Sequence, residues 1–203
     1  MECSLIMEPR DLTRLPRDLP IPEDDGAADG LEGLRIPDVR LTSTLGLEVD
    51  LHQVSSGRLM LYVYPRTGTP GKPSPPGWDQ IPGARGCTPE NCAFRDHEGE
   101  LRSLGAAVIG LSSQPLDEQR EFAERERISY PLVNDSGLVL ARELGLPTFE
   151  AAGMTLYKRL TLIAEAGTIT KAFYPVFPPD RHPEEVIAWL RARLLKDDSE
   201  AER

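Results

Sequence analysis

The chain has 203 residues, of which 39% are hydrophobic and 28% are charged, and its formal net charge is −10. These values are typical of one globular domain with appendages, which can bury a core without metal or disulfide staples. The negative charge argues against binding to nucleic acid or to anionic membranes, both of which require a basic face. No apolar run approaches a membrane span and the N-terminus lacks a signal-peptide layout, so we expect a cytoplasmic protein.

Composition divides the chain into three parts. Residues 1–34 are rich in Pro, Asp, Glu and Gly and are predicted to form a mobile acidic extension. A domain is predicted over 35–196, and a solvated tail over 197–203. Within the domain, residues 71–85 are dense in Pro and Gly and are predicted to form a long loop.

Apolar patterning predicts helices and strands that alternate along the domain. In chain order they are a hairpin over 41–54 turning at Gly46, a strand over 58–65, a helix over 88–105, a strand over 105–114, a helix over 115–126, a strand over 130–135, a helix over 137–145, two strands over 154–177 joined at 165–167, and a helix over 182–197. This order predicts an α/β protein. A thioredoxin-like fold, with a central mixed β-sheet flanked by helices, fits it.

The cysteines number three, Cys3, Cys87 and Cys92. An odd, low count in a chain of this size does not indicate a secreted disulfide framework. In a reducing compartment a close pair is typical of catalysis, redox chemistry or metal binding. A zinc site is disfavoured, because Cys87, Cys92 and His97 offer at most three of four ligands. Cys3, in the extension, is interpreted as an adventitious thiol, with a resolving role left open.

Cys87 stands where a helix is predicted to begin. Pro89 and Glu90 in the first turn are typical of a helix N-terminus, whose free N–H groups and dipole stabilise an anion. Only the thiolate of a cysteine is strongly nucleophilic, and an ordinary thiol has a pKa of about 8.5. Arg85, Arg95 and Arg159, the last on a strand, are candidates to stabilise the thiolate. The alternative is a small buried hydrophobe at a helix start.

Cys92 follows Cys87 by five residues. On an ideal helix their Cα atoms would be roughly 8–9 Å apart, on faces about 140° apart. A disulfide needs Cα atoms within about 7 Å, so this pair can bond only if the first turns of the helix unwind. The alternative is that Cys92 is an ordinary buried helix residue.

The segment "GCTPENCAFRD" resembles the active-site helix of peroxiredoxins, most closely the bacterioferritin-comigratory-protein or PrxQ group. The preceding Tyr64-Pro65 and Thr69-Pro70-Gly71 are similar to the family's strand end and turn. Downstream, "KRLTLIAEAGTI" resembles the family's arginine strand, with Arg159 at the arginine position. The resemblance covers roughly residues 36–195.

The resemblance implies a thioredoxin fold and a peroxidase of hydrogen peroxide and organic hydroperoxides. Cys87 would be the peroxidatic cysteine, oxidised to a sulfenic acid, and Cys92 the resolving cysteine that forms a disulfide with it. Arg159 would stabilise the thiolate and polarise the peroxide, and Glu90 would orient the arginine. The family implies reduction by thioredoxin or a similar dithiol, and no metal, haem or flavin. We expect a monomer, from the lack of a sustained apolar surface stripe.

This chain departs from the family pattern before its cysteine. Lys72 stands where the family spacing would place the cysteine, and Cys87 comes later. We interpret residues 71–85 as an insertion that loops out, with Thr69 carrying the family hydroxyl back to Cys87. Trp78 in the insertion is interpreted as a hydrophobic pin, or alternatively as a cap on the site.

Two other functions fit the same residues. Cys92 would be structural if an external thiol resolves the oxidised Cys87. The pair would be a non-enzymatic redox sensor if oxidation only reshapes a binding surface. A thiol–disulfide oxidoreductase is disfavoured, because the chain lacks a C-x-x-C motif.

Overall fold

The structure is a computed structural model that describes residues 12–201, with side chains described to residue 196. Its centre is a five-stranded mixed sheet in the order β5-β4-β3-β8-β9. β3 and β5 both run parallel to β4, whereas β8 is antiparallel to both β3 and β9. The bounds of these strands are Arg58–Val63 for β3, Ala106–Ser112 for β4, Leu132–Asn134 for β5, Leu160–Glu165 for β8 and Thr168–Phe173 for β9.

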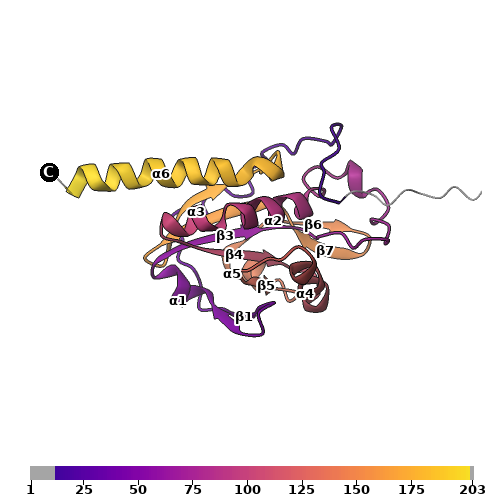
Figure 1. The fold of residues 1–203 in the computed structure, drawn as a ribbon, viewed down its shortest axis with the longest axis horizontal. Coiled ribbons are helices and arrows are strands. Elements are labelled where there is room, and N and C mark those ends of the chain that lie inside the picture. The colour runs from indigo at the N-terminus through magenta and orange to yellow at the C-terminus, as the bar shows by residue number, and fades with distance from the viewer. Residues whose placement is uncertain (1–11, 202–203) are drawn as a thin grey trace, which may run out of the picture.

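Helices cover both faces of this sheet. Figure 1 shows α2 and α6 on one side of β3 and β4, with α1 on the other. Within residues 12–201, no helix is long and apolar enough to cross a membrane. The helix bounds are Leu51–Ser55 for α1, Cys87–Asp96 for α2, Glu98–Ser103 for α3, Leu116–Arg125 for α4, Val139–Leu144 for α5 and His182–Ala201 for α6, with short 3-10 turns at Trp78–Gln80 (η1) and Pro179–Arg181 (η2).

The central strand β3 has a core on each side. Successive side chains of a strand point to opposite faces. Met60 and Tyr62 pack in a cluster that includes residues of α2, α3, α4 and α6. Leu59, Leu61 and Val63 pack in a second cluster with residues of α1 and α5. All five are fully buried, so the nearly unbroken apolar run of this segment follows from burial on both faces.

Three elements differ from the sequence predictions. The helix predicted over 88–105 is broken at His97 into α2 and α3, with the His97 ring Nδ1 2.9 Å from the Ala93 carbonyl oxygen. The predicted strands over 154–177 are three, because the first part forms β7 (Met154–Tyr157) and pairs with β6 (Thr148–Ala151) in a separate hairpin. The hairpin predicted over 41–54 is observed only as far as Asp50, as β1 (Arg40–Thr42) and β2 (Glu48–Asp50), because the next residues form α1, where the Asp50 carboxylate accepts from the Gln53 N–H.

The N-terminal extension lies along the domain from residue 12, although its composition predicts mobility. The Asp25 carboxylate pairs with the Lys158 ammonium at 2.5 Å and accepts a hydrogen bond from the Tyr174 hydroxyl at 2.7 Å. Leu31 is buried in the second core cluster. Local composition cannot reveal these contacts, because the partners lie more than a hundred residues away. At the other end, α6 continues to Ala201, beyond the start of the predicted tail.

Candidate active site

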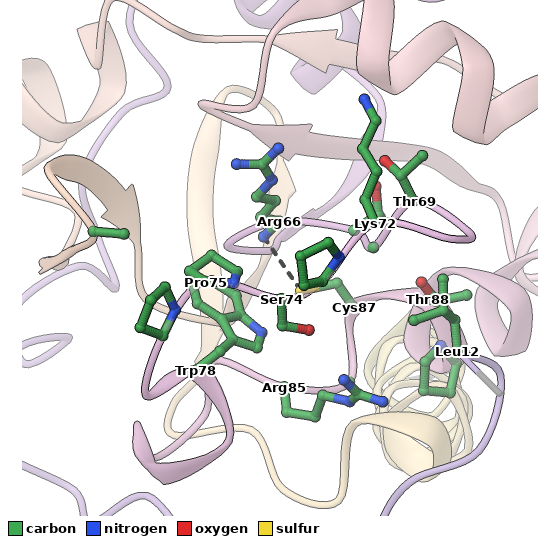
Figure 2. Close-up of a pocket in the computed structure, with 17 residues that line it drawn as sticks. Leu12, Arg66, Thr69, Lys72, Ser74, Pro75, Trp78, Arg85, Cys87 and Thr88 are labelled. Carbon is green, nitrogen blue, oxygen red and sulfur yellow. Dashed lines mark hydrogen bonds between the residues drawn. The ribbon is translucent and has the colours of Figure 1, made fainter. Parts of the chain in front are cut away.

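Cys87 lies in the wall of a pocket of about 340 Å³. The pocket is bounded by the loop after β3, the start of α2 and Leu12 from the N-terminal extension. Figure 2 shows Arg66 and Lys72 on one side of Cys87, with Arg85 on the opposite side. Cys87 is 2% exposed, and the pocket opens beside it.

Two N–H groups from distant parts of the chain converge on the Cys87 sulfur. The Arg66 backbone N–H donates to Sγ at 3.3 Å, and the Arg159 Nη2 donates to it at 3.2 Å. Cys87 is also the first residue of α2. The free N–H groups and dipole of a helix N-terminus favour negative charge at this place. The sequence prediction that Cys87 and Arg159 meet agrees with this geometry.

Arg159 is held in position by Glu90 and by two carbonyl groups. Its Nη1 forms a buried ion pair with the Glu90 carboxylate, three residues after Cys87 on the same helix. Its Nη2 donates to the carbonyl oxygens of Gly83 and Arg85, each at 3.2 Å. Both carbonyls belong to the insertion, so this loop helps to fix the arginine that contacts the thiol. Glu90 therefore acts on Cys87 through Arg159, as a positioning residue.

Burial and charge act in opposite directions on the Cys87 thiol. Burial raises its pKa above the ordinary value, the Arg159 guanidinium opposes this, and the Glu90 carboxylate adds to it. The net direction is upward in this closed, reduced conformation, whereas the sequence suggested a favoured thiolate. Burial likewise raises the pKa of Glu90 to about 7, against the pull of Arg159. The two members of this ion pair therefore act oppositely on the pKa of Cys87, which Arg159 lowers and Glu90 raises.

Cys92 lies on α2 away from Cys87 and has different neighbours. Its Sγ donates toward the Glu126 Oε2 at 3.6 Å, and the Arg95 Nη1 lies 3.8 Å from it. Burial, followed by the Glu126 charge, raises the pKa of Cys92 to about 11. Both cysteines of the helix are free thiols. A disulfide between them requires α2 to unwind, as its ideal geometry predicts.

The remaining candidate residues are divided between the site and its surroundings. Thr69 lines the pocket with Cys87, while the insertion loops out after it. Arg85 also lines the pocket but pairs with Asp79 at 3.5 Å. Arg95 was a candidate to stabilise Cys87 and instead contacts Cys92, because it lies two turns along α2. Cys3 falls outside the described residues.

Trp78 both pins the insertion and borders the pocket. It is 5% exposed and packs in a small apolar cluster with Ala84, Ala151 and Leu156. Its ring centroid lies 6.2 Å from that of Phe149. These contacts fit the predicted hydrophobic pin. The same side chain lines the Cys87 pocket, so the alternative role at the site mouth is compatible with them.

Sequence reasoning missed the groups that fix the loop before Cys87. The Arg66 donor is a backbone N–H, which no side-chain pattern can reveal. The buried Thr67 N–H and hydroxyl both donate to the Gln114 Oε1 at 3.0 Å, tying this loop to the end of β4. The Arg66 side chain forms a two-pronged ion pair with the Glu118 carboxylate, at 2.8 and 3.1 Å. Only the fold brings these segments together.

A second missed feature is a buried hydrogen-bond network that holds the first turns of α2. The Asn91 amide donates to the Cys87 carbonyl oxygen at 2.8 Å and accepts from the Tyr62 hydroxyl at 2.7 Å. The Tyr62 and Tyr130 hydroxyls lie 3.0 Å apart, and Tyr130 donates to the Asn91 carbonyl oxygen at 3.2 Å. Unwinding α2 must break this network. Among the side chains described, no group of three or more His, Cys, Asp or Glu is arranged to hold a metal ion.

Replacing Gly86 with alanine is expected to destabilise the start of α2. Gly86 has a φ of +107°, and an added Cβ would lie 2.5 Å from the Pro179 Cγ and 2.9 Å from the Leu15 Cδ2. Backbone strain and overpacking together should lower the free energy of unfolding by about 2–4 kcal/mol. Urea denaturation measures this loss.

The matched control is Gly46→Ala, at a φ of +79° with open space around the added Cβ. It carries the backbone strain alone, about 1 kcal/mol. Equal losses for the two variants would contradict the close packing of Leu15 and Pro179 on Gly86.

Comparison with known proteins identifies the architecture around this thiol. The Redoxin family model matches residues 31–188, which is more than half of the chain. The chain belongs to the Redoxin family. The matched region contains β3, α2, and both donors to the Cys87 sulfur, the Arg66 N–H and the Arg159 guanidinium. Leu12 and the preceding extension lie outside it.

Similar proteins refine this assignment. A chloroplastic peroxiredoxin Q of Gentiana triflora is 28% identical over 156 residues, which cover 77% of this chain and 64% of the relative. A putative peroxiredoxin of Mycobacterium tuberculosis (strain ATCC 25618 / H37Rv) is 29% identical over 140 residues, covering 68% of this chain and 81% of the relative. The chain thus spans less than two thirds of the Gentiana protein. These matches confirm the predicted resemblance to the peroxiredoxin Q group.

Solved structures confirm the thioredoxin-like fold. The peroxidoxin BcpB of Mycobacterium tuberculosis has a TM-score of 0.64 and 28% identity, covering 79% of this chain and 96% of that structure. A mutant PrxQ of Xylella fastidiosa has a TM-score of 0.65 at 21% identity, covering 80% of this chain and 96% of that structure.

Proposed function

We propose that this protein is a thiol peroxidase that reduces hydrogen peroxide and organic hydroperoxides through Cys87. The supporting observation is the convergence of the Arg66 N–H and the Arg159 guanidinium on a sulfur that borders an open pocket. The same donors can bind the oxygen atoms of a peroxide, whose O–O bond gains negative charge as it breaks. A peroxide-consumption assay with a dithiol reductant tests this function directly.

In the oxidation step, the Cys87 thiolate attacks the outer oxygen of the hydroperoxide. The S–O bond forms as the O–O bond breaks, so the sulfur loses two electrons and the peroxide gains them. The products are a sulfenic acid on Cys87 and water or an alcohol, after a proton reaches the leaving oxygen. Arg159 stabilises the thiolate before attack and the leaving oxygen during it.

In the proposed resolution step, the Cys92 sulfur attacks the Cys87 sulfenic acid. An S–S bond forms, the S–O bond breaks and water leaves. Thioredoxin, or a similar dithiol, then reduces this disulfide by thiol–disulfide exchange. The pKa of Cys92, raised to about 11, and its contacts with Glu126 and Arg95 support a resting state in which the Cys92 thiol does not react. This state ends when α2 unwinds.

Replacing Cys92 with serine is expected to separate oxidation from resolution. Cys92→Ser should still consume one peroxide per chain rapidly, because Cys87 and Arg159 are unchanged. Turnover with thioredoxin should fall at least about tenfold, because no intramolecular disulfide forms. Intact mass should show the addition of one oxygen in place of the loss of two hydrogens.

Full turnover of Cys92→Ser with thioredoxin would contradict the resolving role and favour resolution by an external thiol. Wild-type oxidation no faster than that of a free thiol, together with changed partner binding, would favour the redox sensor. Cys3→Ser is the control for both measurements, because it removes the third thiol and leaves only Cys87 and Cys92 to react.

A further inference from the structure

The pocket beside Cys87 is larger than hydrogen peroxide requires. Its volume of about 340 Å³ falls in the range of small-molecule sites, about 300–1,000 Å³, whereas one water occupies about 30 Å³ of liquid. Much of its wall is apolar and comes from the N-terminal extension and from residues 71–85, which we interpret as an insertion. These side chains are Leu12 of the extension and Pro73, Pro75, Pro76 and Trp78 of the insertion. The pocket therefore suits a hydroperoxide with an apolar body.

The charge of the pocket wall is opposite to that of the protein. The described wall contains Arg66, Lys72 and Arg85 and no Asp or Glu, although the chain carries a net charge of −10. Two of these charges are compensated, since Arg66 pairs with Glu118 and Arg85 with Asp79. Compensated cations contribute little to the attraction of an anion.

Lys72 is the exception in this wall. Its ammonium has no ion pair or side-chain hydrogen bond with any residue that the structure describes, and its backbone N–H closes a turn with the Thr69 carbonyl at 3.1 Å. In Figure 2 its side chain extends away from Cys87, so that the ammonium lies at a distance from the thiol. The pocket wall thus contains one cation without a charged partner among the described residues, and its ammonium is directed away from the reacting sulfur.

From these observations we propose that Lys72 selects organic hydroperoxides that carry a carboxylate. The hydroperoxide group meets Cys87 and Arg159, the apolar body lies against the proline and Trp78 wall, and the carboxylate pairs with the Lys72 ammonium. The carboxylate takes no part in the chemistry. This inference rests on the proposed peroxidase function and adds the substrate class and the residue that determines it.

The test compares two hydroperoxides that differ in one group, cumene hydroperoxide and its para-carboxyl analogue. Stopped-flow kinetics give the second-order rate constant for Cys87 oxidation by each at low ionic strength. The wild-type protein should prefer the carboxylated peroxide by about three- to tenfold, as expected for one partly exposed charge pair. High salt should remove most of this preference. Lys72→Met should bring the ratio close to one, whereas Lys72→Arg should retain it.

The control variant is Lys196→Met on α6, which changes the net charge equally at a residue outside the pocket wall. Its ratio should equal that of the wild type. Two results would overturn the inference and leave the proposed function intact, provided that both peroxides are reduced. In the first, Lys72→Met does not change the ratio of the two rate constants. In the second, Lys196→Met lowers that ratio as much as Lys72→Met does. Failure to reduce either peroxide would overturn the proposed function and the inference with it.

Discussion

Replacing Cys87 with serine is expected to lower the second-order rate constant for peroxide reduction by at least about 10³-fold. A hydroxyl cannot replace the thiolate as nucleophile, and the donors from Arg66 and Arg159 would then face a neutral oxygen. Stopped-flow measurement of peroxide loss by the prereduced protein checks this. The folded state should be retained, because serine is smaller than cysteine and keeps a group that can accept both hydrogen bonds.

The matched control for this variant is Cys92→Ser, on the same helix. It should retain the first rapid oxidation, while Cys87→Ser loses it. Cys87 would not be the only peroxidatic residue if both variants kept the rapid oxidation. The same would hold if both variants lost it.

Replacing Arg159 with glutamine is the second change with a large expected effect. The variant loses the guanidinium that contacts the Cys87 sulfur at 3.2 Å, so the thiolate and the leaving oxygen both lose a charged donor. We expect kcat/KM to fall about 10²- to 10³-fold. The pKa of Cys87 should also rise, because a positive charge that lowers it is removed. Ultraviolet absorbance of the thiolate follows this titration in a background that carries both Cys3→Ser and Cys92→Ser, where Cys87 is the remaining thiol.

Two further variants separate the effect of Arg159→Gln on activity from its effect on stability. Arg159→Gln leaves the buried Glu90 carboxylate unpaired, at an expected cost of about 3–5 kcal/mol of unfolding free energy. The double variant with Glu90→Gln should recover much of this stability without recovering activity. Glu90→Gln alone should lower the pKa of Cys87, because it removes a negative charge that raises it. Shifts in the same direction for Arg159→Gln and Glu90→Gln would contradict the proposed charge arrangement.

Much of the fold could be predicted from the local pattern of apolar residues and turns in the sequence. The apolar run of β3 and the turn at Gly46 predicted elements that the structure contains. The break at His97 was missed, because His97 is not a helix-breaking residue and the nearby Gly99 lies inside α3. The placement of residues 12–34 was missed as well, since it depends on partners such as Lys158 that are remote in the sequence.

The parts of the candidate site that consist of reactive or charged side chains could be predicted from the sequence. Cys87, Glu90 and Arg159 come together as the resemblance implied. The backbone donor of Arg66 has no sequence signal, and the Asn91 network requires three elements to meet. The role of Thr69 stays a prediction, with its place in the pocket wall as support.

The proposed function requires that peroxide oxidises Cys87 and that Cys87 then forms a disulfide with Cys92. The most direct test mixes prereduced Cys3→Ser protein with one equivalent of hydrogen peroxide and follows peroxide loss and intact mass together. We expect rapid loss of the peroxide and a product lighter by two hydrogen atoms, with Cys87 and Cys92 recovered in one disulfide-linked peptide. Peroxide loss no faster than with a free thiol, or a product with both cysteines still reduced, would contradict the proposed function.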